Sequence, residues 1–247
     1  MEKKLDGRNV LITGASRGLG AALARRFARE GATVILLART QGALEELDDA
    51  IRMETGHAAV LVPMSLLDSD TIDQVGATIY QRFGRLDVLI GNAGTLGSLS
   101  PLGHIDPPVW NEVVGVNATA NYRLIRSLDP LLRRSGSGRA IFTGDSISEE
   151  NIPYWGGYAA SKAMLRSIVL TYAGEMRTTS VRVNLVEPGV MRTRLRATAF
   201  PGEPPEKSPP PESVVDTYVE LALPSCTRHG EIVHPDTVTR PVHATLS

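Results

Sequence analysis

Short continuous runs of apolar residues alternate along this chain with longer segments whose apolar residues recur at helical spacing. The first pair shows the pattern: an apolar run at 9–13 is followed by Leu19, Leu23 and Phe27, which share one helical face. The pattern predicts strands at 9–13, 32–38, 58–63, 86–90, 139–143, 181–186 and 231–233. It predicts helices at 19–30, 42–55, 69–83, 107–134, 155–177 and 212–223.

Strands that are apolar throughout and alternate with helices are typical of a parallel sheet covered on both faces. We therefore expect an α/β fold with a single-domain, Rossmann-like, doubly wound parallel sheet of about seven strands, spanning residues 1–247. The six prolines within 200–211 are expected to exclude regular structure there. A Pro-rich insertion around 194–212 is either a rigid surface loop or a lid over a substrate site.

Composition narrows the class of partner. Lys and Arg number 26 against 27 Asp and Glu, a net charge of -1 that offers no footprint for nucleic acid. Cys226 is the single cysteine and the five histidines are dispersed, so neither a disulfide framework nor a metal site is expected. We find no apolar leader and no 18-residue apolar run, so no membrane contact is expected and the cytoplasm is the predicted location.

The first predicted strand runs into a glycine-rich turn, Gly14-Ala15-Ser16-Arg17-Gly18-Leu19-Gly20, that opens a helix. Glycines let a backbone approach a pyrophosphate closely, and the helix N-terminus attracts the negative charge. The strand-turn-helix context favours a dinucleotide site, and the alternative is a plain tight turn.

A second candidate lies in the predicted helix at 155–177, where Tyr158 and Lys162 stand four residues apart and share a face. A nearby ammonium favours the phenolate and lowers the tyrosine pKa, so the pair could move protons near neutral pH. Such a pair can also be an ordinary solvated helix face.

Taken together, the motifs resemble those of the short-chain dehydrogenase/reductase (SDR) family. They are, in order, Thr13-Gly14-x-x-x-Gly18-x-Gly20, Asn92-Ala93-Gly94, Asn117, Tyr158-x-x-x-Lys162 and Pro188-Gly189. The resemblance implies binding of NAD or NADP and hydride transfer between nicotinamide and a small carbonyl or alcohol substrate. It places Asn92, Ala93 and Gly94 at the adenosine ribose. It further implies that Pro188, Gly189, Val190 and Thr193 hold the nicotinamide carboxamide.

The end of the second predicted strand bears on the choice of dinucleotide. A carboxylate there reads a ribose 2′-hydroxyl, whereas a 2′-phosphate requires cations. Ala38 stands at the family's usual acidic position, Arg39 follows it, and Arg17 lies in the glycine turn. NADPH is therefore expected rather than NADH, the alternative being that both arginines are solvated surface. Ser65 replaces a frequent aspartate near the adenine, where Leu66 is expected to contact the ring.

By resemblance, Tyr158 transfers the proton, Lys162 lowers its pKa, Asn117 holds a water, and a serine thirteen positions before the tyrosine polarises the substrate. Here that position is Asp145, and Ser146 comes one residue later. A carboxylate cannot donate a hydrogen bond to a carbonyl and repels a developing oxyanion. Three arrangements would restore activity. We favour a local shift that brings Ser146 inward. The alternatives are a protonated Asp145 that donates a hydrogen bond, and a cationic substrate that pairs with Asp145 with help from Glu149 and Glu150.

The leading hypothesis is an NADP(H)-dependent carbonyl reductase or alcohol dehydrogenase. Asp145 supports an alternative, a cofactor-binding protein with weak or no turnover. A structural interaction protein, the third possibility, explains neither the glycine turn nor the Tyr158–Lys162 pair. The resemblance also implies a homodimer or homotetramer built through the helices that carry Asn117 and Tyr158.

Overall fold

The centre of the molecule is a parallel sheet in the strand order β3-β2-β1-β4-β5-β6-β7, seen in a computed structural model that describes residues 3–236. Residues 1–2 and 237–247 of the predicted domain lie outside the described part. The strands are β1 (Asn9–Thr13), β2 (Thr33–Ala38), β3 (Val60–Pro63), β4 (Val88–Gly91), β5 (Arg139–Thr143), β6 (Arg182–Val186) and β7 (Ile232–Val233). The predicted doubly wound α/β fold is confirmed, with each strand within two residues of its predicted bounds.

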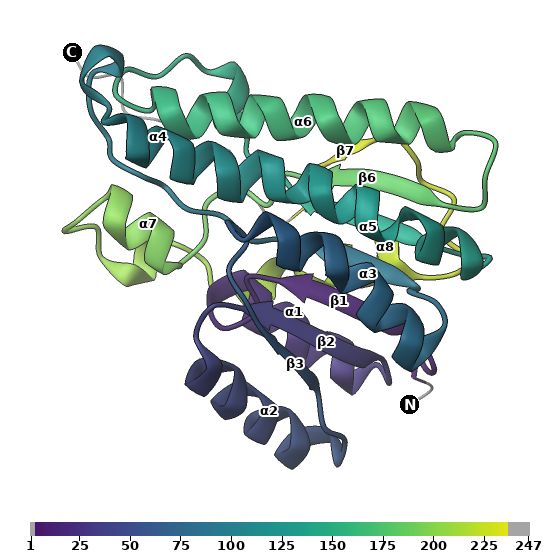
Figure 1. Cartoon of the computed structure of the whole chain (residues 1–247). Coiled ribbons are helices and arrows are strands. Elements are labelled where there is room, and N and C mark those ends of the chain that lie inside the picture. The colour runs from purple at the N-terminus through teal and green to yellow at the C-terminus, as the bar shows by residue number, and fades with distance from the viewer. Residues whose placement is uncertain (1–2, 237–247) are drawn as a thin grey trace.

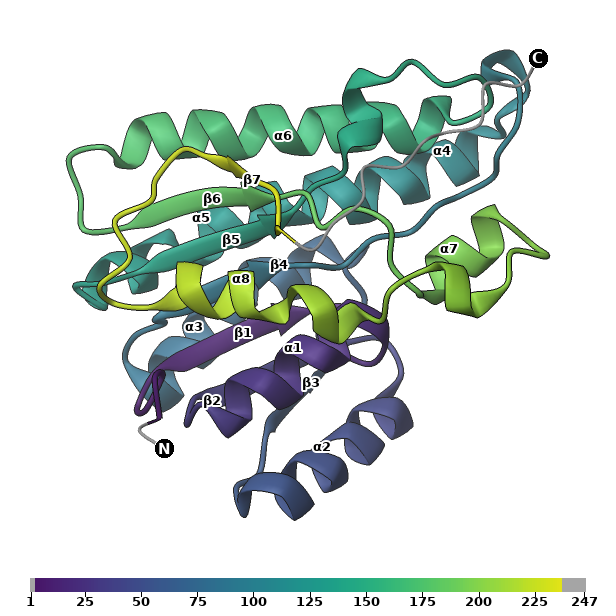
Figure 2. The same cartoon turned by 180° about the vertical axis from the view of Figure 1, so that it is seen from behind.

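Helices cover both faces of the sheet (Figures 1 and 2). One face carries α1 (Gly18–Arg29), α2 (Gln41–Thr55) and α8 (Val215–Ala222). The opposite face carries α3 (Ser69–Phe83), α4 (Pro107–Val114), α5 (Ala120–Arg134) and α6 (Gly156–Met176). A short helix, α7 (Arg194–Ala199), stands apart from both layers.

Alternate residues of each strand feed two separate cores. In β1, Val10 and Ile12 pack with Phe27 of α1 and Tyr218 of α8. Leu11 lies between them in sequence and belongs to the other core, which includes α3, α5 and α6. Successive strand side chains point to opposite faces, so a strand buried on both faces must be apolar at every position. This is why the sequence shows continuous apolar runs rather than alternation.

Two segments differ from the sequence prediction. The predicted helix 107–134 contains a π-helical turn, Gly115–Thr119, between α4 and α5. The proline-rich segment is also more ordered than expected, because 3-10 turns form at Pro205–Lys207 and Pro211–Val214. The prediction that prolines exclude regular structure there was wrong. Proline is tolerated at the start of a helical turn, where its missing N–H would have no partner.

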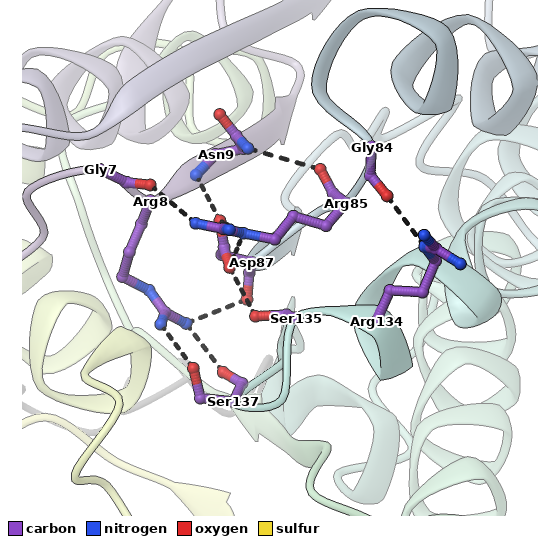
Figure 3. Close-up of polar contacts among 9 residues, drawn as sticks. All are labelled: Gly7, Arg8, Asn9, Gly84, Arg85, Asp87, Arg134, Ser135 and Ser137. Carbon is purple, nitrogen blue, oxygen red and sulfur yellow. Dashed lines mark hydrogen bonds and ion pairs between the residues drawn. The ribbon is translucent and has the colours of Figure 1, made fainter.

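A buried polar cluster ties together the amino ends of β1, β4 and β5 (Figure 3). The Arg8 guanidinium donates from Nη2 to the carbonyl oxygens of Asp87, at 3.1 Å, and Ser137, at 2.9 Å. The Asp87 carboxylate in turn accepts the Asn9 amide at 2.8 Å and the Arg85 guanidinium at 3.1 Å. Burial lowers the pKa of Arg8 to about 10. The cluster fixes the strand ends that lie opposite the candidate site.

Candidate functional site

A cleft of about 670 Å³ runs along the carboxyl ends of the strands. Parallel strands end at the same edge, so loops far apart in sequence meet there. The candidate residues that line the cleft are Gly14, Ser16, Arg17, Gly18, Leu19, Arg39, Leu66, Asn92, Ala93, Gly94, Asp145, Tyr158, Lys162, Pro188, Gly189, Val190 and Thr193. The remaining candidates, Gly20, Asn117 and Ser146, do not line it.

The glycine turn is packed tightly against the loop that follows β4. Gly14 has φ +64°, and a Cβ there would lie 2.8 Å from Ala93 Cα. The Asn92 side chain donates from Nδ2 to the Thr13 carbonyl oxygen at 3.0 Å. Thr13 Oγ1 accepts the backbone amides of Asn92 and Ala93, each at 3.0 Å. Asn92 and Thr13 therefore hold the turn, a role for Thr13 that the sequence alone did not suggest.

The first turn of α1 is open to a ligand. Arg17 stands at the N-cap position without a side-chain cap hydrogen bond, and no acidic residue occupies the first turn. The leading N–H groups of a helix need partners, and an anion supplies them. With glycine backbone on one side and the helix N-terminus on the other, the residues present fit a dinucleotide pyrophosphate.

Two arginines border the same end of the cleft. Arg17 and Arg39 are both exposed, and neither forms an ion pair within residues 3–236. Arg39 follows Ala38, where β2 ends, and Leu66 lines the cleft nearby. The guanidinium groups are thus available to an anionic ligand such as a phosphate, which an arginine can bind through two parallel hydrogen bonds.

At the other end of the cleft lie Tyr158 and Lys162, one helical turn apart on α6. Their exposed fractions are 5% and 4%. Lys162 Nζ lies 5.7 Å from the centroid of the Tyr158 ring and donates to the Thr143 carbonyl oxygen at 2.9 Å. Burial lowers the pKa of Lys162, while the charges of Asp145 and Glu187 oppose that change.

Asp145, not Ser146, faces the tyrosine. The Tyr158 hydroxyl donates to Asp145 Oδ2 at 2.9 Å, whereas Ser146 Oγ donates to Glu150 Oε1 at 3.0 Å on the exposed side of the loop. The hypothesis of an inward shift of Ser146 was therefore wrong. Asp145 Oδ1 accepts the Ile147 amide and caps a 3-10 turn, Ser146–Glu149, and this capping holds the carboxylate in place.

The hydrogen bond to Asp145 has an electrostatic consequence for the tyrosine. Burial raises the pKa of Tyr158 well above its usual value, and the charge of Asp145 and its hydrogen bond raise it further. The family arrangement, in which a cation lowers the tyrosine pKa, is thus opposed here by a carboxylate. Glu149 and Glu150 do not line the cleft, and Arg166 is paired with Glu149.

Asn117 is fully buried in the π-helical turn. Its side chain accepts the Thr95 amide at 2.8 Å and donates to the Thr95 carbonyl oxygen at 2.9 Å. The side chain also donates to Ser161 Oγ on α6 at 2.9 Å. The backbone carbonyl oxygen of Asn117 accepts a hydrogen bond from Asn121 Nδ2 at 2.9 Å. Asn117 thus fixes the loop after β4 against the helix that carries Tyr158 and Lys162.

An apolar wall lies beside Tyr158, and part of it comes from the proline-rich segment. Trp155 packs on Phe200 with ring centroids 5.8 Å apart, and the Arg196 guanidinium lies 3.7 Å from the Phe200 centroid. Arg196 is held by both carboxylate oxygens of Glu203 at 2.7 Å. Further apolar residues that line this part of the cleft are Leu96, Ile147, Leu195 and Ala199. Trp155 itself lines the cleft.

Within residues 3–236, no group of three His, Cys, Asp or Glu side chains is placed to hold a metal ion. Among the helices of this part of the chain, none has the length and apolar character needed to span a membrane.

Comparison with known proteins identifies the family of this chain. The model of the short chain dehydrogenases matches residues 8–204. The chain belongs to the short-chain dehydrogenase/reductase family. This SDR is 38% identical to the oxidoreductase YciK of Escherichia coli (strain K12) over 219 residues, covering 88% of this chain and 86% of that protein. It is 31% identical to the 3-oxoacyl-[acyl-carrier-protein] reductase FabG of Thermotoga maritima over 230 residues, covering 89% and 92%.

Solved structures agree with the assignment. A short chain dehydrogenase from Escherichia coli CFT073, complexed with NADPH, superposes with a TM-score of 0.91 at 36% identity, covering 96% of this chain and 99% of that one. The resemblance expected from the motifs is confirmed, and this SDR is an oxidoreductase.

Proposed function

We propose that this SDR is an NADP(H)-dependent oxidoreductase that transfers hydride between nicotinamide and a small carbonyl or alcohol substrate. The observation that carries the proposal is the single cleft that joins the glycine turn to the buried Tyr158–Lys162 pair. One end of it fits a dinucleotide, and the other holds a group able to give or take a proton.

Arg17 and Arg39 support NADP(H) over NAD(H), because both guanidinium groups border the end where the adenosine ribose of a dinucleotide is expected. A related structure complexed with NADPH supports the same choice. When bound, the cofactor supplies or accepts the hydride. In this proposal Gly14, Ser16, Gly18 and Leu19 receive the pyrophosphate.

The remaining cofactor contacts follow the order of the loops along the cleft. Leu66 borders the adenine, and Asn92, Ala93 and Gly94 line the ribose region. The loop after β6 holds the carboxamide through Pro188, Gly189, Val190 and Thr193. All eight residues line the cleft, and this common placement supports the assignment.

In the proposed reaction Tyr158 donates a proton to the carbonyl oxygen during reduction and accepts one during alcohol oxidation. Lys162 stabilises the phenolate, and Asn117 positions the helix that carries both. Asp145 takes the place of a carbonyl-polarising donor and weakens reduction. Loss of one such donor typically lowers the rate about a hundredfold to a thousandfold.

A second candidate is a cofactor-binding protein with weak or no turnover. The observation that favours it is the hydrogen bond from the Tyr158 hydroxyl to Asp145, which occupies the proton that reduction requires and raises the pKa of Tyr158. The two candidates differ only in chemistry after the cofactor binds.

The test measures NADPH binding by fluorescence and then NADPH oxidation over a panel of aldehydes, ketones and diketones. The variants are wild type, Asp145→Ser and Ser146→Ala. The enzyme proposal expects turnover by wild type, a faster rate for Asp145→Ser, and no loss for Ser146→Ala, since Ser146 faces Glu150. Turnover by Asp145→Ser alone would favour the second candidate, and absence of NADPH binding would exclude both.

We also propose a homodimer or homotetramer in the cytoplasm. Large apolar side chains on the layer formed by α4, α5 and α6 support self-association, since Trp110, Tyr122 and Met164 have exposed fractions of 36%, 52% and 44%. Light scattering after gel filtration measures the assembly, and a monomeric mass would exclude it.

The segment 194–212 is proposed as the substrate loop, because Phe200 and Leu195 line the cleft.

A further inference from the structure

The Asp145 carboxylate is fixed on the wall of the cleft beside the reacting end. Its Oδ1 accepts the Ile147 amide at 3.1 Å and its Oδ2 accepts the Tyr158 hydroxyl at 2.9 Å. A carboxylate has about four acceptor sites, so these two bonds leave acceptor capacity on a side chain that lines the cleft.

No cation within residues 3–236 forms a direct ion pair with this carboxylate, although its charge acts on the ammonium of Lys162. Asp145 forms no ion pair within residues 3–236, and the nearby ammonium of Lys162 donates to the Thr143 carbonyl oxygen instead. Arg166 is bound by Glu149, and the Glu187 carboxyl group, 4% exposed, lies behind Gly144. Because this half-buried carboxylate makes no direct ion pair, a ligand that brings a cation into contact with it stabilises it.

A carbonyl substrate does not meet that requirement. A carbonyl oxygen is only an acceptor, and the facing carboxylate is also an acceptor. A protonated C=N group meets it, because its N–H donates a hydrogen bond and its positive charge is opposite to that of the carboxylate. The apolar wall of Leu96, Trp155 and Phe200 excludes water beside the pair, which strengthens the attraction.

We propose that the site reduces a second class of substrate, protonated imines with a small hydrocarbon frame, whose iminium N–H is held by Asp145. This activity rests on the proposed NADPH site. The iminium carbon accepts the hydride from the reduced nicotinamide, and the C=N π pair becomes the lone pair of the nitrogen. The products are a neutral amine and the oxidised cofactor, so charge and hydrogen balance without a proton from Tyr158.

Carbonyl reduction and iminium reduction therefore differ in their need for the Tyr158 hydroxyl. Carbonyl reduction needs the Tyr158 proton, whereas reduction of an iminium does not. We therefore expect Tyr158→Phe to abolish reduction of a ketone and to leave reduction of a protonated imine within about tenfold of wild type.

The test compares 2-methyl-1-pyrroline with cyclopentanone, a ketone of the same ring size, as substrates with NADPH. The wild type is expected to show a kcat/KM for the pyrroline at least about tenfold above that for the ketone. Asp145→Ser, which places a neutral donor at the same position, is expected to reverse the order. A wild type that prefers the ketone, or an Asp145→Ser variant that keeps the pyrroline preference, would overturn the inference and leave the proposed oxidoreductase intact.

A second readout needs no cofactor. Pyrrolidinium and cyclopentanol are titrated into the protein alone by ligand-observed NMR. The wild type is expected to bind pyrrolidinium about tenfold to a hundredfold more tightly than Asp145→Asn, with cyclopentanol unaffected. Equal pyrrolidinium affinity for the two proteins would refute recognition by Asp145. Failure of NADPH to bind wild type would instead refute the proposed oxidoreductase, and the reduction of imines with it. Circular dichroism melts identify any variant that fails to fold, and Asp145→Ser then replaces Asp145→Asn in the titration.

Discussion

Gly20 offers the sharpest test of how the proposed dinucleotide site is built. It lies in the first turn of α1 against the backbone of the glycine turn. A Cβ at Gly20 would lie 2.8 Å from both the Gly14 carbonyl carbon and Asn92 Nδ2, and closer still to the Gly14 carbonyl oxygen. Real side chains do not tolerate such contacts with backbone. Gly20→Ala therefore forces the turn and the start of α1 apart.

The expected cost follows from this geometry. Overpacking in a tightly packed region destabilises a protein by about 1–3 kcal/mol. For a chain of this size each 1 kcal/mol lowers Tm by about 2–4 °C, so Gly20→Ala is expected to lower Tm by about 2–12 °C. The shift also moves the N–H groups that would face a pyrophosphate, so NADPH affinity should fall on the order of tenfold or more.

Gly42 supplies the matched control, because it also stands in the first turn of a helix, α2, and a Cβ there would meet no atom within 4 Å. Gly42→Ala is expected to be neutral or to stabilise the protein by up to about 1 kcal/mol, with unchanged NADPH affinity. Thermal unfolding and NADPH fluorescence titration measure both variants. Equal Tm and equal affinity for the two variants would refute the reasoning.

Three further predictions test the charged groups. Arg39→Ala should weaken NADPH binding about tenfold and leave NADH binding unchanged, whereas Arg52→Ala, in the last turn of α2, should change neither. Equal loss for both cofactors would contradict the assignment. Asp145→Asn removes a charge that raises the pKa of Tyr158, so this pKa should fall. The alkaline rise of kcat/KM for alcohol oxidation should then move to lower pH, and an unmoved profile would argue against Tyr158 as the base. Arg8→Met deletes three buried or part-buried hydrogen bonds at the opposite edge of the sheet. It should lower the free energy of unfolding, measured in urea, by about 2–4 kcal/mol. A change below about 0.5 kcal/mol would show that these hydrogen bonds contribute little to stability.

The sequence alone determined the fold and most of the cleft. Apolar runs alternating with helical patterns are local consequences of a sheet buried on both faces, so the strands could be predicted within two residues. The glycine turn and the Tyr158–Lys162 spacing are also local, since each depends on residues within one turn or one helix. The order of these motifs then indicated the family, which the comparisons confirm.

Only the tertiary structure decided which side chain faces the tyrosine. Asp145 and Ser146 are neighbours, and the choice between them depends on how the chain leaves β5, on the cap that Asp145 gives to Ile147, and on the position of α6. The same holds for Asn117, whose three side-chain hydrogen bonds join a loop and a helix distant in sequence. Such contacts are set by packing between elements, so local sequence patterns do not predict them.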